Sequence, residues 1–455
     1  MAVDAKLAGR LNDELSTDLQ ENGRLGLVRR YLNGEHDLPY MPKGAKQEYL
    51  HLAKQSITNW TPLLSDTYAK GLFVDGYRPA NAADNAAPWG YWQANGLDAR
   101  QSIAHRGALE YGAAYTLVLP GSIQTRRIPL IKPLSPLRSA AWYQDDDDEF
   151  PELGLRRRGV TANGTTLIEV YDRKSVYTFA KPKDNDNWIL SSEEEHGLGY
   201  TPFVRFRDRL DGEAVGIIRP HVTLQNRVNE IVFSTLIALQ YAAFRQRWAS
   251  GLVIPEDDDG NPIEPFESAV NRLWISDNPE ARFGDFAQTE LSGHMAAYES
   301  TVRTLAATAQ ISPNILTGDL VNLSADALAQ MEASTQRKMG EYETLFGESW
   351  EHVFRLAALA AGDSTAAMDT AAQVRWRDTE ARSLAQTVDA LGKIAQMLQV
   401  PVEALWEKIP GVTDQDVTYW KSIKDSTDLL GGLVEEMQRQ SGTTNPAALE
   451  GTSEA

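Results

Sequence analysis

The sequence contains no cysteine among its 455 residues. This absence excludes disulfide bonds, thiolate nucleophiles and cysteine-ligated metal sites together. No run approaches the roughly 18 to 20 apolar residues that span a bilayer, and residues 1–10 lack the basic-then-apolar order of a signal peptide. We therefore expect a soluble, intracellular protein without membrane contact, stabilised by burial and assembly.

Signatures of catalysis are missing as well. A phosphate-binding loop ends in Gly-Lys-Ser/Thr, but the single Gly-Lys pair, Gly392-Lys393, is followed by Ile394 in a helical pattern. Metalloprotease and nucleophile-elbow patterns are absent, and the seven histidines never pair at ligand spacing. We expect no enzyme activity, no metal site and no cofactor.

Basic residues are scarce relative to acidic ones, and the net charge is −19. This argues against a cationic face that grips nucleic acid, yet it is compatible with a surface that guides DNA without holding it. Plain solubility also explains it. The acidic runs 145–149 and 257–259 are expected to be solvated turns, since nothing supplies the converging partners of a metal site.

Basic side chains gather at two places. The run 156–158 is expected on a strand, where its side chains point to opposite faces and suit ordinary surface or subunit contacts. Arg245 and Arg247 leave a long helical segment. There they could contact DNA or a subunit, or simply complement the helix dipole.

Three long segments have helical period: residues 216–247, 290–310 and 324–361. The last would form a rod of roughly 55 Å at 1.5 Å per residue, too long for one small core. Such rods suit a wall, a spoke or a bundle. Trp350 lies beside a stripe already filled by other apolar residues, so contact with a neighbouring subunit is one interpretation of it.

The remaining pattern predicts an α+β fold. Helical period covers residues 2–21, 24–33, 46–72 and 89–111. Period two then predicts an antiparallel meander of short strands at 116–119, 128–132, 153–158, 167–171, 176–179, 188–190 and 203–206. One more strand is expected at 374–376, followed by a helical cluster over 380–399, 402–408 and 414–438 and a frayed tail at 441–455.

Two connections between the long helices differ in kind. Residues 248–287 carry an acidic turn between two apolar strand-like runs, which predicts a small α/β insert. Residues 311–323 form a short loop containing Pro313 and Gly318.

Several short sequence segments, taken in their order along the chain, are the basis of a resemblance to a known family. They are Tyr31-Leu32-Asn33-Gly34, the stretch 71–76, the stretch 108–115, Gly199-Tyr200-Thr201-Pro202, the stretch 224–229 and Ile311-Ser312-Pro313. In this order, with an insert between paired helices and a loop before a long helix, the chain resembles a tailed-phage portal protein of the long-tailed siphophage type. The resemblance covers roughly residues 7–438.

The resemblance implies a portal fold with an antiparallel β-rich wing, a helical stem, a long kinked helix, a small α/β clip insert and a helical C-terminal crown. Its parts map as follows: wing 1–215, first stem helix 216–247, clip 248–289, second stem helix 290–310, tunnel loop 311–323, long wing helix with return strand 324–379, crown 380–440 and disordered tail 441–455.

The resemblance also implies site residues. In the tunnel loop, the DNA channel would be formed by Leu316, Thr317, Gly318, Asp319, Leu320, Val321 and Asn322. In the clip, motor and connector docking would involve Ile254, Glu256, Asp257, Asp258, Asp259, Phe266 and Trp274.

As a portal protein, the chain would form a ring of about twelve subunits at one capsid vertex, through which double-stranded DNA is packaged and ejected without sequence specificity. Implied partners are the terminase large subunit, the head-tail connector or adaptor, the major capsid protein and the scaffold. The ring would be part of the virion and be assembled in the host cytoplasm. Alternatives are another capsid component, such as a minor head or scaffold protein, a monomeric helical adaptor, or a DNA-processing enzyme.

Overall fold

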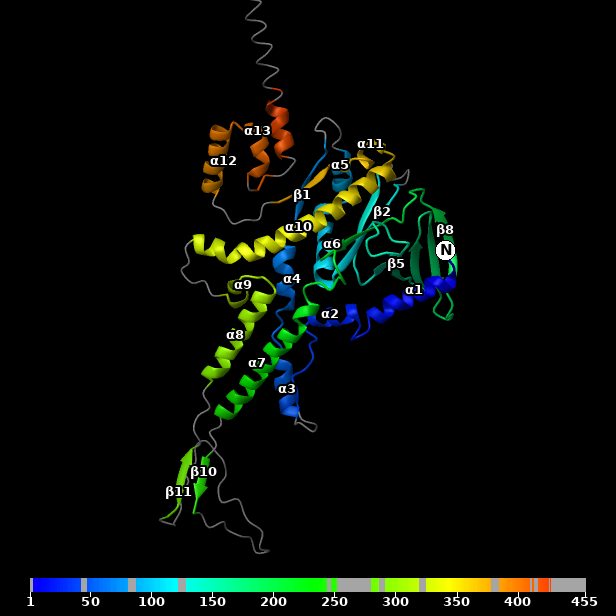
Figure 1. Cartoon of the computed structure of the whole chain (residues 1–455). Coiled ribbons are helices and arrows are strands. Elements are labelled where there is room, and N and C mark those ends of the chain that lie inside the picture. The colour runs from blue at the N-terminus through cyan, green and yellow to red at the C-terminus, as the bar shows by residue number, and fades with distance from the viewer. Residues whose placement is uncertain are drawn as a thin grey trace, which may run out of the picture. The chain divides into compact units, whose positions relative to one another are not determined.

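The computed structural model describes residues 3–41, 47–80, 87–121, 128–243, 247–251, 280–285, 291–318, 325–377, 384–409, 411–412, 416–424 and 426. The chain forms two compact units, each built from segments distant in the sequence. The first unit comprises residues 1–15, 68–214 and 339–455, and the second comprises residues 16–67 and 215–338. Figure 1 labels their helices and strands.

The described part of the first unit contains two larger antiparallel sheets and one two-stranded pair. One has three strands in the order β3 (Leu130–Leu134), β2 (Ala113–Leu119), β9 (Phe203–Arg207). The other has five in the order β4 (Ser139–Trp142), β5 (Leu153–Val160), β6 (Thr166–Tyr171), β7 (Ser175–Lys181), β8 (Ile189–Glu195). The predicted antiparallel strands are confirmed, but the single meander is wrong. β9 pairs with β2 instead of β8, because period two reveals a strand and not its partner.

The two sheets meet at Phe203 of β9. A Cβ atom on Gly154 of β5 would lie 2.6 Å from the Phe203 ring, so only glycine lets the ring rest on the β5 backbone. The Tyr171 ring centroid lies 5.2 Å from that of Phe203, and Leu117 and Leu134 complete the buried cluster. The contact fixes the five-stranded sheet against β2 and β9.

Helix α1 (Ala5–Asp18) lies against the five-stranded sheet. Arg157 of β5 donates to the Asn12 carbonyl oxygen at 2.7 Å. Its neighbours Arg156 and Arg158 instead form ion pairs with Glu169 on β6, at 3.2 and 2.9 Å. The predicted split of this basic run between two faces is confirmed.

The acidic run 145–149 forms a turn, as predicted. It is not only solvated, because one of its carboxylates forms ion pairs with β9. Asp146 pairs with Arg205 at 2.9 Å and with Arg207 at 3.0 Å. The hydrogen bond from Arg205 lowers the pKa of the Asp146 carboxyl below its ordinary value. Arg205 also lies over the Tyr143 ring, 3.8 Å from its centroid. The turn therefore ties the start of β5 to β9.

The helical core of the first unit lies around Trp350 of α10 (Ala325–Ala361). The predicted helix at 89–111 is divided into α5 (Ala87–Ala94) and α6 (Leu97–Tyr111), because Gly96 adopts a φ of 61°. Trp350 is fully buried against Trp92 and Phe206, with ring centroids 4.8 Å apart in both pairs. The interpretation of Trp350 as a contact with a neighbouring subunit is therefore wrong.

His105 of α6 completes this core. It donates from Nδ1 to the Leu72 carbonyl oxygen (3.1 Å), and its Nε2 accepts the indole N–H of Trp350 (2.8 Å). Burial lowers the pKa of His105 to about 3. The ring is therefore neutral, with its proton on Nδ1.

A separate antiparallel pair joins β1 (Val74–Arg78) to β12 (Gln373–Trp376). The short helix α11 (Ser364–Ala367) precedes β12 in the chain. The strand at 374–376 is confirmed. β1 was not predicted, because its sequence contains Asp75 and Gly76, which are rare in strands. The C-terminal cluster contains α12 (Leu384–Leu398), α13 (Val402–Leu405), the 3-10 helix η3 (Trp406–Lys408) and helical residues 416–424.

The second unit is mainly helical. It contains α2 (Arg24–Leu32), α3 (Gln47–Gln55), most of α4 (Thr61–Ala69), η2 (Arg219–His221), α7 (Val222–Ala243), α8 (Ser292–Thr308), α9 (Pro313–Thr317) and the hairpin of β10 (Arg247–Ser250) and β11 (Arg282–Asp285). α7 packs against both α8 and α3. The first long helix begins at residue 222, later than predicted, because η2 with Pro220 precedes it.

Candidate functional site

Most of the residues predicted to contact partners lie outside the described residues: Arg245, Ile254, Glu256, Asp257, Asp258, Asp259, Phe266, Trp274, Asp319, Leu320, Val321 and Asn322. Arg247 does not end the helix as predicted. It begins β10, opposite Asp285 of β11. The described candidates are Leu316, Thr317 and Gly318.

These three residues lie at a corner that follows α8. Gln310 adopts a φ of 57°, which ends the helix, and the Ile311 amide donates back to the Ala306 carbonyl oxygen at 2.9 Å. This is a Schellman type of helix end, with glutamine where glycine is usual. Thr335 of α10 donates its hydroxyl to the Gln310 carbonyl oxygen at 3.0 Å. A hydrogen bond from a second helix thus stabilises the left-handed backbone of Gln310.

The corner is anchored by apolar burial. The predicted loop at 311–323 contains the helix α9, with Pro313 at its first position. Ile311 and Leu316 are 2% and 3% exposed. The Leu316 side chain is therefore buried in the single chain. Thr317 and Gly318 are exposed, and Gly318 ends α9 with a φ of 70°.

A polar joint connects the N-terminal helices of the second unit to α7. Gln225 and Asn229 lie one turn apart on α7, and both are completely buried. Gln225 accepts from the Trp60 amide (3.1 Å) and donates to the Thr58 carbonyl oxygen (2.6 Å). Asn229 Oδ1 accepts from the Thr58 amide and from Gln225 Nε2, both at 3.1 Å. The two side-chain amides thus form hydrogen bonds with backbone groups of Thr58 and Trp60, which lie outside any helix or strand.

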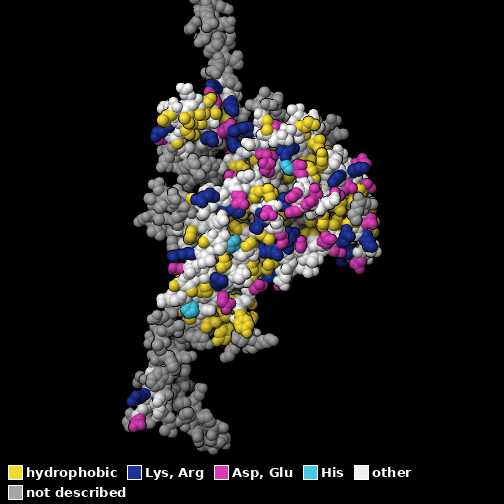
Figure 2. Space-filling view, viewed as in Figure 1, with side chains coloured by type: hydrophobic (Ala, Val, Ile, Leu, Met, Phe, Trp, Pro, Cys, Tyr) yellow, Lys and Arg dark blue, Asp and Glu magenta, His cyan; other side chains and the backbone are white. Residues whose placement is uncertain are grey.

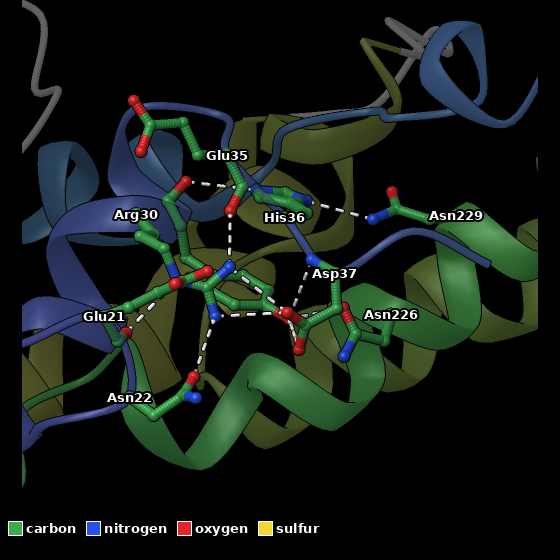
Figure 3. Close-up of polar contacts among 9 residues, drawn as sticks. Glu21, Asn22, Arg30, Glu35, His36, Asp37, Asn226 and Asn229 are labelled. Atoms are coloured by element: carbon green, nitrogen blue, oxygen red, sulfur yellow. Dashed lines mark hydrogen bonds and ion pairs between the residues drawn. The ribbon is translucent and has the colours of Figure 1, made fainter. Parts of the chain in front are cut away.

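His36 is the centre of this joint (Figure 3). Asn229 Nδ2 donates to His36 Nδ1 at 3.0 Å, so the ring proton lies on Nε2. That nitrogen lies 3.0 Å from the Tyr31 carbonyl oxygen and 3.2 Å from Asn59 Oδ1, both acceptors. Burial lowers the pKa of His36 below its ordinary value. The joint thus requires a neutral imidazole.

The other side of the joint is charged. Arg30 donates from Nη1 and Nη2 to Asp37 Oδ1, both at 3.1 Å, and from Nη1 to the Glu35 carbonyl oxygen at 3.0 Å. The Tyr31 hydroxyl lies 3.0 Å from Asp37 Oδ2 and 2.8 Å from Asn226 Oδ1 of α7. Burial raises the pKa of Tyr31. Figure 3 shows Arg30 and Asp37 beside the turn after α2 and Asn226 on α7.

The joint was missed as a site, although its sequence signals are present. Residues 31–34 and 224–229 were singled out as separate pieces, and the structure brings them together through Tyr31 and Asn226. Gln225 and Asn229 are two polar residues four apart beside the apolar Leu224 and Val228. Such a pair on a buried helix face predicts a hydrogen-bonded partner.

Comparison with known proteins identifies the family. The model of the family "Phage portal protein, SPP1 Gp6-like" matches residues 13–428. This chain belongs to the phage portal protein family. The match includes α7, α8, the corner and the polar joint, so the described site lies wholly within the portal protein's matched region.

Two curated relatives carry the same name. The "Portal protein" of Mycobacterium phage D29 is 24% identical over 353 residues, which cover 73% of this chain and 71% of that protein. The "Portal protein" of Mycobacterium phage L5 is 23% identical over 360 residues, with the same coverage. Among solved structures, a chain from the "Neck of empty GTA particle computed with C6 symmetry" has a TM-score of 0.48 and 11% identity, covering 83% of this chain and 94% of that one.

Among the described residues, no three His, Cys, Asp or Glu side chains gather in a way that could hold a metal ion. In the same residues, no helix combines the length and apolar character of a membrane span. The corner and the joint position helices, which is the structural role expected of this family.

Proposed function

We propose that the chain assembles into a closed ring at one capsid vertex, through which double-stranded DNA enters and leaves the capsid. The observation that carries the ring is the surface of α7 and α3. Leu239 of α7 is 45% exposed and Leu50 of α3 is 42% exposed. Ile231, Leu236 and Ile237 of α7 are only half-buried. Figure 2 shows hydrophobic side chains gathered over α3.

A neighbouring copy would cover this surface. Contacts between different faces of identical chains close into a ring when the rotation between neighbours is right. The stem would then consist of α7 and α8 from each copy, the clip of residues 248–289 and the crown of residues 380–440. A ring of twelve follows the family resemblance.

DNA would pass a surface that does not hold it. The tunnel loop would be residues 311–323, with Leu316 to Asn322 at the DNA channel, and it contains no Lys or Arg. Each phosphate neutralised by a cation adds salt-dependent affinity, so a loop without cations permits sliding. The clip residues 254–274 would dock the terminase motor and later the head-tail connector. The major capsid protein and scaffold would surround the ring in the host cytoplasm before it becomes part of the virion.

The ring is tested by the mass of the purified protein. Native mass spectrometry of the wild type should give a closed oligomer near twelve subunits. Leu239→Glu should release smaller species, because each interface would lose about 2 kcal/mol of apolar burial and gain a buried carboxylate.

The matched control is Leu210→Glu, at a residue that is 63% exposed in the first unit. This variant should keep the wild-type mass. A monomeric wild type, or unchanged rings in Leu239→Glu, would contradict the proposal.

A further inference from the structure

A cleft of about 1170 Å³ lies in the first unit, between the β1–β12 pair and the helices α12 and α13. Its charged lining residues are Arg78, Arg375, Arg377, Lys408, Lys421, Asp75, Glu403 and Glu407. Cations outnumber anions here, whereas the whole chain has a net charge of −19. The lining of the cleft therefore has a net positive charge, opposite in sign to the net charge of the protein.

Two of the three anions of the cleft are mostly buried, whereas the Glu403 side chain is 35% exposed and pairs with Lys424. The Asp75 side chain is 10% exposed and accepts from Arg375 Nε at 3.0 Å. The Glu407 side chain is 19% exposed and lies 2.5 Å from Arg78 Nη2 and 3.8 Å from Arg375 Nη1. Both carboxylates are thus neutralised within the wall of the cleft.

Four of the five cations face solvent, whereas the Arg375 side chain is 17% exposed. The side chains of Arg78, Lys421 and Arg377 are 68%, 53% and 45% exposed, and Lys408 is also exposed. Figure 2 shows Lys and Arg side chains gathered beside α13. A ligand that approaches the cleft meets these four cations, of which Arg78 and Lys421 also pair with Glu407, together with the partly exposed Glu403.

The kind of anion follows from the kind of donor. A discrete phosphate is usually held by backbone amides of a glycine-rich turn at a helix start. Here the donors are long, exposed side chains, which neutralise an extended polyanion by counterion release and without sequence preference. We propose that this cleft binds the phosphate backbone of double-stranded DNA. The inference rests on the proposed function, which brings duplex DNA to the protein.

The test is fluorescence anisotropy of a labelled duplex of arbitrary sequence, titrated with the full-length protein at several chloride concentrations. The double variant Lys408→Gln, Lys421→Gln should weaken binding at low salt. It should also flatten the plot of log affinity against log salt, by about 0.9 for each phosphate that the variant no longer neutralises. The charge-conserving pair Lys408→Arg, Lys421→Arg should retain wild-type binding.

Lys174→Gln, Lys183→Gln is the matched control, since these two lysines lie in turns of the five-stranded sheet away from the cleft lining. Its affinity and salt dependence should equal those of the wild type. Equal binding by the cleft variant and this control would overturn the proposal. Inorganic phosphate should compete no better than chloride of equal ionic strength, and stronger competition would indicate a discrete phosphate site and refute duplex binding.

The oligomeric mass of every sample separates the two proposals. Rings that bind DNA equally with and without the cleft lysines would refute the cleft and leave the ring standing. A monomer whose DNA binding depends on these lysines would refute the ring and support the cleft.

Discussion

The polar joint on α7 makes a sharp prediction about pH. In the wild type, Asn229 donates to His36 Nδ1, and burial lowers the pKa of His36. The neutral ring is therefore favoured in the folded state. This contribution to stability is complete above about pH 6.5 and is lost as the pH falls below it, because the unfolded chain then binds the extra proton.

Asn229→Asp should invert this dependence. Aspartate still accepts from Thr58 and Gln225, but without a proton it faces the lone pair of His36 Nδ1. One unmet buried contact costs about 1–3 kcal/mol, which increases local opening roughly 5- to 150-fold at high pH. When the pair takes up one proton, a charge-assisted hydrogen bond replaces the repulsion and recovers about 1.5–3 kcal/mol.

Hydrogen exchange of α7 measures this locally. Peptides from 222–243 should exchange faster in Asn229→Asp than in the wild type at about pH 8, and the difference should vanish near pH 6 after correction for intrinsic rates. Asn33→Asp adds the same charge at an exposed position outside the joint and should behave as the wild type. Parallel pH dependence in Asn229→Asp and the wild type would refute the assigned proton positions.

Four further substitutions test the packing and the backbone. A Cβ on Gly26 would lie 1.7 Å from a backbone carbonyl oxygen, so Gly26→Ala should lower the free energy of unfolding by more than about 2 kcal/mol. Gly340→Ala, in open space on α10, should raise it by about 0.5–1 kcal/mol, and equal effects in urea unfolding would contradict the corner between α1 and α2. Gln310→Gly should raise the melting temperature, because it relieves about 1 kcal/mol of left-handed strain, and a lower value would show that the strain is absent. Trp350→Phe leaves His105 Nε2 without its donor and should cost about 1–3 kcal/mol in urea, whereas an unchanged midpoint would contradict that hydrogen bond.

Periodicity predicted the elements well and their partners poorly. The apolar stripe of α10 was evident because helical spacing repeats for many turns, and the helix is confirmed over Ala325–Ala361. The interpretation that Trp350 of this helix contacts a neighbouring subunit was wrong. Phe346, Trp350 and Val353 are fully buried within their own chain. A stripe shows that a face is covered and does not show by what.

The candidate site divides in the same way. Pro313 and Gly318 marked the corner after α8, since each sets a backbone angle that local sequence can report. The hydrogen bond from Thr335 to Gln310 could not be predicted, because it is a single contact between residues 25 positions apart in the sequence. The joint around His36 was hidden for a similar reason, as its partners Asn59 and Asn229 come from distant segments.

The return of β9 to β2 makes residues 135–202 an excursion from the three-stranded sheet. The chain leaves that sheet after β3 and re-enters it at β9, and both strands flank β2. The strand pairing of β2, β3 and β9 is therefore complete without the five strands between them. Those five strands contact the framework through Phe203, which packs on Gly154 and Tyr171, and through the ion pairs of Asp146 with Arg205 and Arg207. A lineage could lengthen, shorten or replace this excursion as a module, while the three-stranded platform beneath it keeps its pairing.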